Sequence, residues 1–102
     1  MKDARIPEAG GRVILERARV DADVVEYGAT LCTESGEHAT VARIDRASGT
    51  VSFDAWSTGE PPVWLVAFAR AFLRSEWLEH RDEPDAPWPA RINRWRAPKA
   101  GG

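Results

Sequence analysis

One segment of the chain, residues 63–81, has both the length and the apolar spacing of an α-helix, and this segment constrains the fold most strongly. Ahead of it, Ser57 and Glu60 have the spacing of a capping box. The prolines at 61–62 fit a first helical turn, whose N–H groups have no partners inside the helix. We therefore expect one long helix in the second half of the chain.

The apolar side chains of this helix occupy a wide arc of its surface. At about 100° per residue, one arc holds Trp64, Leu65, Phe68, Ala69 and Phe72. A second flank holds Val66, Leu73 and Trp77. One face of a sheet cannot cover both, so we expect the second flank to be covered by the C-terminal segment or by a second subunit.

Four segments ahead of the helix have the composition or the alternation of β-strands: 12–20, 24–33, 38–45 and 50–56. The first could also form a short helix, but its β-branched residues and the flanking glycines favour a strand. Gly28, inside the second segment, suggests a bulge or a close backbone approach. Because the connections are short, we expect the strands to form an antiparallel meander.

The segment 82–98 carries four of the seven prolines and no helix-length apolar run, so we expect it to be extended. Trp88, Ile92 and Trp95 nonetheless have i, i+4, i+7 spacing, and a helical turn could place them on one side. All five tryptophans lie between Trp56 and Trp95, and each needs a core, an interface or a stacking partner. We expect Trp88 and Trp95 to pack back on the domain and cover the second helix flank.

Together these elements predict an α+β fold: a four-stranded antiparallel β-meander followed by one long α-helix packed on the sheet, with a C-terminal extension rich in Trp, Arg and Pro. The predicted organisation is a flexible N-terminal lead-in at 1–11, a single α+β domain at 12–81, an extended tail at 82–98 that packs back on the domain, and a disordered C-terminus at 99–102. A chain of 102 residues can bury one core without a disulfide or a metal.

Charge is unevenly placed along the chain. Residues 86–102 hold four of the 14 basic residues and no acid, a net charge of +4, so residues 1–85 carry 10 bases and 16 acids, a net charge of −6. A tail of opposite sign can fold back on its domain or reach an acidic partner. The N-terminus lacks the apolar run of a signal peptide, and the longest apolar stretch, 63–69, is too short to span a bilayer. We therefore expect a cytoplasmic protein with no membrane partner.

Cys32 and His38 flank one predicted hairpin turn, with Glu37 beside them, and could form a nucleophile–base pair. Nothing in the sequence marks an oxyanion site, however, and a cysteine near a strand end is more often a small buried hydrophobe. The two histidines and one cysteine lack the close-pair spacing of structural zinc sites. His80 is expected on the surface, where it suits the helix dipole. We therefore predict no catalytic, cofactor-binding or metal-binding residue, and a protein that is not an enzyme.

The surplus of tryptophan and the wide apolar arc favour a small non-enzymatic protein-interaction module that binds a second copy of itself or another protein. The candidate interaction surface comprises Val66, Leu73, Trp77, Trp88, Arg91, Ile92, Arg94, Trp95 and Arg96. The alternative is single-stranded nucleic-acid binding, in which the tail tryptophans stack on bases while its arginines contact phosphates.

Overall fold

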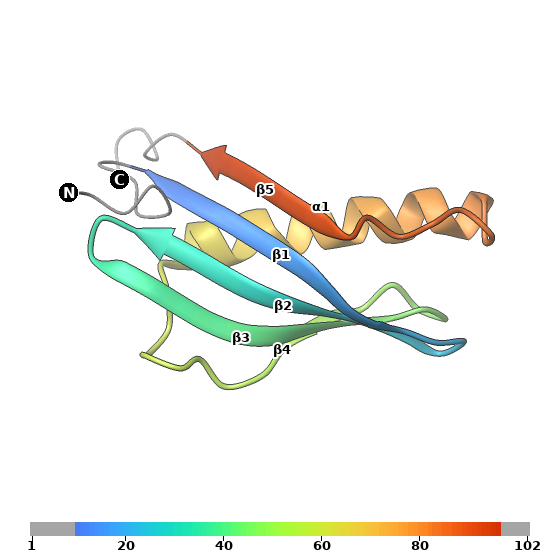
Figure 1. Ribbon diagram of the computed structural model, residues 1–102, viewed down its shortest axis with the longest axis horizontal. Helices are drawn as coiled ribbons and strands as arrows, with labels where there is room; N and C mark the ends of the chain where they lie inside the picture. Colours follow the sequence, from blue (N-terminus) through green and yellow to red (C-terminus); the bar gives the residue numbers. More distant parts are fainter. Residues whose placement is uncertain (1–9, 97–102) are drawn as a thin grey trace.

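The computed structural model describes residues 10–96, and within them the chain forms one antiparallel sheet and one helix (Figure 1). The elements in chain order are β1 (Gly11–Val20), β2 (Val24–Thr33), β3 (Gly36–Asp45), β4 (Val51–Phe53), α1 (Val63–Asp82) and β5 (Arg91–Arg96). The sheet has five strands in the order β4-β3-β2-β1-β5. The predicted α+β class, with its four-stranded meander and one helix packed on the sheet, is confirmed.

The predicted terminal segments fall mostly outside the described residues. Residues 1–9 of the lead-in, residues 97–98 of the tail and all of 99–102 lie there. Gly11, which was assigned to the lead-in, is instead the first residue of β1.

The C-terminal segment contributes a fifth strand that the sequence did not reveal. β5 pairs antiparallel with β1, from Gly11↔Arg96 to Glu16↔Arg91. Residues an odd number apart in a strand point to opposite faces, so Ile92 and Trp95 cannot share a side. Ile92 is buried under the helix, whereas Trp95 keeps 50% of its surface exposed. The helical turn considered for this segment is therefore wrong.

The start of α1 also differs from the expectation. The helix begins at Val63, with Pro62 at the N-cap and no capping side-chain hydrogen bond. The prediction of a capping box is therefore wrong, as is the prediction that both prolines lie in the first helical turn. Ser57 lies instead against β3, where its N–H donates to the carbonyl of Ala39 at 2.9 Å and its Oγ accepts from the Ala39 N–H at 3.1 Å. These bonds hold the β4–α1 connection along the outer edge of β3.

A stripe of side chains spaced mostly four apart packs α1 onto the sheet. Its buried members are Leu65, Ala69, Leu73, Trp77 and His80. Leu73 and Trp77 therefore belong to the sheet-facing stripe and not to a flank that needs a separate cover. The aromatic row Trp64, Phe68 and Phe72 lies at one margin of this stripe and is half-buried.

The sheet contains a β-bulge, but it lies on β1 and not at Gly28 of β2, where it was predicted. The β1–β2 register shifts between Arg17 and Arg19, which makes Ala18 the extra residue. Gly28 pairs regularly with Glu16, and a Cβ added there would meet the Glu16 carbonyl at an ordinary 3.8 Å. Gly28 therefore marks neither a bulge nor a close approach.

Candidate functional site

The proline-rich segment between α1 and β5 is fastened to the sheet through its carbonyl groups. Prolines have no N–H to donate, so the segment must be held mainly as a hydrogen-bond acceptor. The Trp88 carbonyl accepts from Arg17 Nη1 at 2.6 Å, and the Pro89 carbonyl accepts from the Tyr27 hydroxyl at 2.7 Å. The Arg17 N–H donates to the Ala90 carbonyl at 2.9 Å. These three bonds fix the position of the Trp88 side chain beside the end of α1.

Trp88 stacks on His80, with ring centroids 3.8 Å apart and planes 11° apart. His80 is only 6% exposed, so the expectation of a surface histidine is wrong. Its Nδ1 lies 2.7 Å from the Glu76 carbonyl. Because a carbonyl can only accept, Nδ1 carries the hydrogen of this contact. Within the described residues, neither His80 Nε2 nor Trp88 Nε1 has a hydrogen-bond partner, although both atoms are buried.

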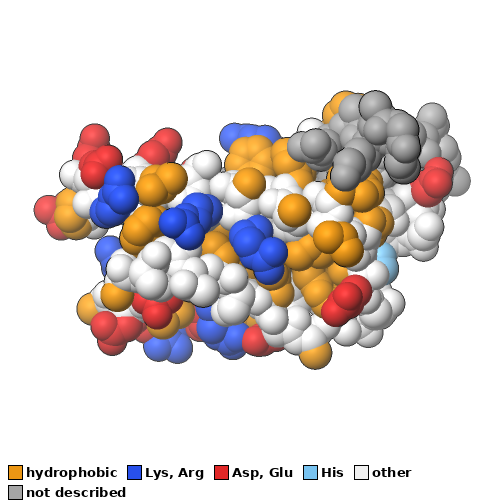
Figure 2. Space-filling model, turned by 180° about the vertical axis from the view of Figure 1, so that it is seen from behind, with side chains coloured by type: hydrophobic (Ala, Val, Ile, Leu, Met, Phe, Trp, Pro, Cys, Tyr) orange, Lys and Arg blue, Asp and Glu red, His pale blue; other side chains and the backbone are white. Residues whose placement is uncertain are grey.

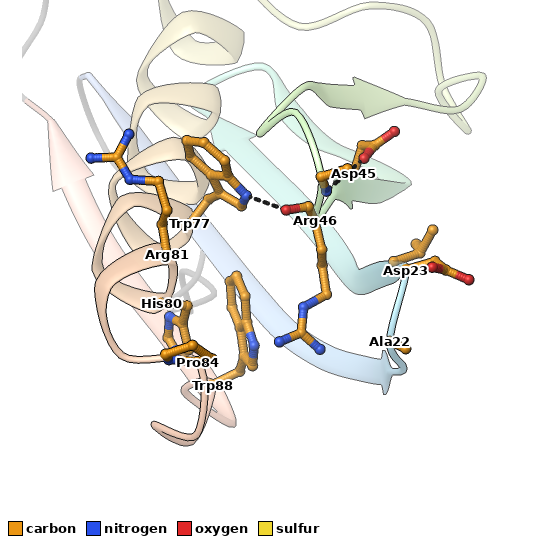
Figure 3. A pocket seen from close by; sticks show the side chains of 11 residues that line it. Ala22, Asp23, Asp45, Arg46, Trp77, His80, Arg81, Pro84 and Trp88 are labelled. Carbon is orange, nitrogen blue, oxygen red and sulfur yellow. Dashed lines mark hydrogen bonds between the residues drawn. The ribbon is translucent and has the colours of Figure 1, made fainter.

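A cavity of about 580 Å³ lies beside this stack, between the end of α1, the β1–β2 turn and the β3–β4 turn (Figure 3). Its lining residues are Ala22, Asp23, Val24, Asp45, Arg46, Ala47, Trp77, His80, Arg81, Pro84 and Trp88. This volume falls in the range of small-molecule pockets. No local sequence pattern indicates the cavity, because its walls come from three segments that are distant along the chain.

Arg46 forms one wall of the cavity. Trp77 Nε1 donates to the Arg46 carbonyl at 2.9 Å, and Arg46 Nη1 donates to the Asp21 carbonyl at 2.6 Å. The guanidinium carbon lies 5.9 Å from the centre of the Trp88 ring. In Figure 3 the indole nitrogen of Trp88 is on the side that faces this guanidinium. Two groups that can only donate hydrogen bonds thus face each other across one corner of the cavity.

The acidic residues near the cavity stabilise its turns. Asp45 Oδ1 accepts from the N–H groups of Ala47 at 2.9 Å and Ser48 at 3.2 Å. Asp21 Oδ1 accepts from the N–H groups of Asp23 and Val24 at 2.9 and 2.8 Å. These two bonds, together with one from Arg19, lower the pKa of Asp21 to about 2. Figure 3 shows the carboxylates of Asp23 and Asp45 directed away from Trp88.

The predicted interaction surface is divided by the structure into core and surface. Leu73, Trp77, Trp88 and Ile92 are buried, Val66 is half-buried, and Arg91, Arg94 and Trp95 are exposed. Arg96 belongs to β5, and its side chain lies outside the described part of the chain. Arg94 places its guanidinium carbon 5.5 Å from the Phe72 ring. The structure thus leaves three exposed members of the set, all on β5.

Cys32 and His38 do not form the considered nucleophile–base pair. Cys32 pairs with Glu37 across the β2–β3 hairpin, and His38 pairs with Leu31. Neighbouring pairs in a hairpin point to opposite faces, so the thiol and the imidazole are separated by the sheet. His38 Nδ1 lies 2.8 Å from the Gly59 carbonyl on the helix-facing side.

The outward face of α1 is a second surface of interest, and we call its exposed apolar residues Val63, Ala67, Ala71 and Leu78 the outer strip. Val63 is 83% and Leu78 is 38% exposed. Figure 2, which views the molecule from the side of the helix, shows hydrophobic side chains gathered there with basic side chains between them. Spacing placed Leu65 and Ala69 correctly on the sheet-facing side but assigned Leu73 and Trp77 to a flank. The apolar character of the outward face was missed because Ala67 and Ala71 were assigned to neither side.

Comparison with protein-family models found no match, and neither the curated proteins nor the solved structures yielded one. Within residues 10–96, no group of three or more His, Cys, Asp and Glu side chains is arranged to hold a metal ion. The helix of the described chain does not have the combination of length and hydropathy needed to cross a membrane.

Proposed function

We propose that this chain is a small, non-enzymatic, cytoplasmic interaction module that pairs with a second copy of itself through the outer strip of α1. The supporting observation is the exposure of Val63 and Leu78, at 83% and 38%, on a helix whose opposite face is fully used by the sheet. Ala67 and Ala71 lie between them on the same face. Small side chains there let two helices approach closely, which large side chains would prevent.

A two-fold axis near Ala71 would arrange the two copies antiparallel, with Val63 of one outer strip close to Leu78 of the other. Arg70, Arg74 and Arg81 lie on the same helix as Glu79 and Asp82, so side chains of both signs border the strip. Opposite charges at such a rim steer association and fix its orientation more than they add affinity.

Sedimentation velocity of the full chain over a range of concentrations tests this proposal. We expect a monomer–dimer equilibrium that Ala71→Glu shifts to monomer, since the new carboxylate lies at the centre of the pairing. Ala55→Glu is the matched control, because Ala55 is exposed on the β4–α1 connection. A wild-type chain that remains monomeric at millimolar concentration contradicts the proposal, as does an equal effect of the two substitutions.

Single-stranded nucleic acid remains the alternative partner, and the exposure of Trp95 favours it. Trp95 pairs with Arg12 across β1 and β5, and Arg91 lies on the same sheet face, opposite the helix. An exposed indole beside guanidinium groups can stack on a base while the cations contact phosphates. The same face also carries Glu16, which pairs with Arg91 and repels phosphate.

Fluorescence quenching by oligothymidylate at low salt tests this alternative. Nucleic-acid binding predicts quenching that Trp95→Ala removes and that salt reverses. Trp88→Phe, which changes a buried tryptophan, should leave it intact. Absence of quenching by the wild-type chain excludes the alternative.

A further inference from the structure

We infer that the cavity beside the Trp88–His80 stack binds the carboxylate of a small, largely apolar organic acid, held between Trp88 Nε1 and the guanidinium of Arg46. The site lies on the sheet side of α1, away from the outer strip, so it is independent of the proposed self-association. The inference rests on the unpartnered Trp88 N–H, on the position of Arg46 and on the walls of the cavity.

The corner of the cavity between Trp88 and Arg46 presents hydrogen-bond donors that an acceptor on a ligand could satisfy. Trp88 is 4% exposed, and its Nε1 has no partner within residues 10–96. An indole N–H and a guanidinium are both donors only, so neither can satisfy the other. A buried donor without a partner is costly, and a carboxylate offers several lone pairs to the two groups at once. A ligand carboxylate would therefore remove an existing penalty as well as form a charge-assisted bond.

The backbone of Arg46 is fixed while its side chain can move, and this difference allows a ligand to enter the cavity. Its backbone is fixed at both ends, since its N–H donates to the Asp23 carbonyl at 2.9 Å and its carbonyl accepts from Trp77. Within the described residues its guanidinium makes one side-chain hydrogen bond, to the Asp21 carbonyl. The guanidinium can therefore turn toward an incoming anion while the main chain stays in place. The approach of an anion requires such a movement, because Trp88 Nε1 is buried in the folded chain.

The remaining walls select a monoanion with an apolar body. Trp77, Pro84 and Ala47 present apolar surface to the cavity, and apolar surface favours a hydrocarbon or aromatic group. Asp23 and Asp45 also line it, and although they point away from Trp88 they disfavour the second negative charge of a phosphate. One carboxylate on an apolar group fits this combination better than a phosphate does.

Proton–nitrogen NMR of the full chain, labelled with ¹⁵N, tests the inference through the indole N–H resonance of Trp88. Trp88→Phe assigns this resonance, because it removes the N–H and keeps an aromatic ring. We expect benzoate to shift the resonance saturably, and benzamide, its neutral analogue, to shift it far less. No saturable shift with benzoate, or equal shifts with the two compounds, overturns the inference. A shift with inorganic phosphate and none with benzoate overturns the carboxylate class.

Variants of the folded chain identify the second donor. Arg46→Gln should weaken benzoate binding about tenfold, which is the effect of losing one charge-assisted hydrogen bond. Arg70→Gln is the matched control, since Arg70 is exposed on α1 and its guanidinium lies over Phe53. Ala71→Glu should also leave benzoate binding unchanged, which separates this site from the self-association surface. Equal benzoate affinity in Arg46→Gln and the wild-type chain contradicts the assignment of Arg46.

Discussion

The stacking of Trp88 on His80 joins the segment after α1 to the helix itself. The two rings are nearly parallel, 11° apart, with centroids separated by 3.8 Å. His80 closes the sheet-facing stripe of α1, and Trp88 precedes β5 by three residues. The contact therefore links the segment that leads into β5 to the last turns of α1. The C-terminal segment is part of the core, although its composition is that of a linker.

Replacement of the two tail tryptophans should have unequal effects on stability. Trp88→Ala removes a side chain that is 96% buried and should lower the free energy of unfolding by about 3–5 kcal/mol. Trp95→Ala changes a side chain that is 50% exposed and should cost less than about 1 kcal/mol. Urea denaturation followed by circular dichroism measures both. Similar losses for the two variants would contradict the packing described for β5.

Gly49 should tolerate no side chain. It has φ +77° in the β3–β4 turn, and a Cβ added there would lie 2.6 Å from ring atoms of Trp77. Gly49→Ala combines a left-handed backbone with a steric clash, and we expect it to lower the free energy of unfolding by about 2 kcal/mol or more.

Gly59→Ala provides the control for Gly49→Ala. Gly59 has a similar φ of +87°, and nothing lies within 4 Å of an added Cβ, so we expect a loss of about 1 kcal/mol. Thermal and urea unfolding of both variants give the difference, which reports the contact with Trp77. If Gly59→Ala is the more destabilising change, this contact is not as close as the structure shows.

The protein should lose stability at alkaline pH through Tyr27. Burial raises the pKa of Tyr27 to about 12 in the folded chain, whereas an unfolded tyrosine has a pKa of about 10. Between these values the unfolded chain loses the proton and the folded chain keeps it. The free energy of unfolding therefore falls as pH rises through this window, by up to about 1.4 kcal/mol per pH unit from this group.

The single tyrosine makes this prediction directly measurable. Ultraviolet absorbance of tyrosinate reports ionisation of Tyr27 alone, and urea denaturation from pH 9 to 12 gives the stability. Tyr27→Phe removes the hydroxyl that donates to the Pro89 carbonyl, and should flatten the pH dependence. Titration of the native chain with an ordinary tyrosine pKa would show that the hydroxyl is not buried as described.

The carboxyl group of Asp21 should titrate far below the usual range. Hydrogen bonds from the N–H groups of Asp23 and Val24 are the largest causes, and Arg19 is a smaller one, of a pKa of about 2. Because the folded pKa is lowered, the stability from this group is complete above the unfolded pKa of about 3.9 and is lost as pH falls toward 2. Carbon-detected NMR titration measures the midpoint.

Arg19→Gln distinguishes the two kinds of cause at Asp21. If the backbone bonds dominate, the pKa of Asp21 in this variant should rise only slightly and stay well below the usual value. A return to the ordinary pKa of an aspartate would assign the effect to Arg19 instead.

Local pattern was sufficient to predict strands β1 to β3 and the helix, whereas the fourth strand, predicted at 50–56, extends only over Val51–Phe53. Strands β1 to β3 alternate or carry β-branched residues, and short polar connections join them, so only hairpins can link them. The segment from Val63 keeps helical spacing until the chain approaches Pro84. Its rotation about its own axis was predicted less well, because Trp77 was assigned to a flank and lies against the sheet. Hydrophobicity alone does not rank faces of a helix that is apolar over such a wide arc.

Almost nothing about the candidate site could be predicted from the sequence. Arg46 and Trp88 are 42 positions apart, and nothing local in either segment indicates that they face each other. His80 was expected at the surface because a histidine near a helix C-terminus suits the dipole, and that argument takes no account of what packs there later. A cavity between three segments depends on side-chain positions that only the folded chain defines.

The amino-acid sequence by itself determined one long helix, the hairpins ahead of it and a chain whose tryptophans all fall in its second half. These properties follow from spacing over a few residues, where backbone geometry and apolar periodicity act locally. The tertiary structure alone decided that 91–96 becomes an edge strand, that Trp88 is core and that Trp95 is exposed. Those outcomes depend on pairing with β1, some 80 residues earlier, and pairing between distant segments is set by hydrogen bonds and burial that no local pattern encodes.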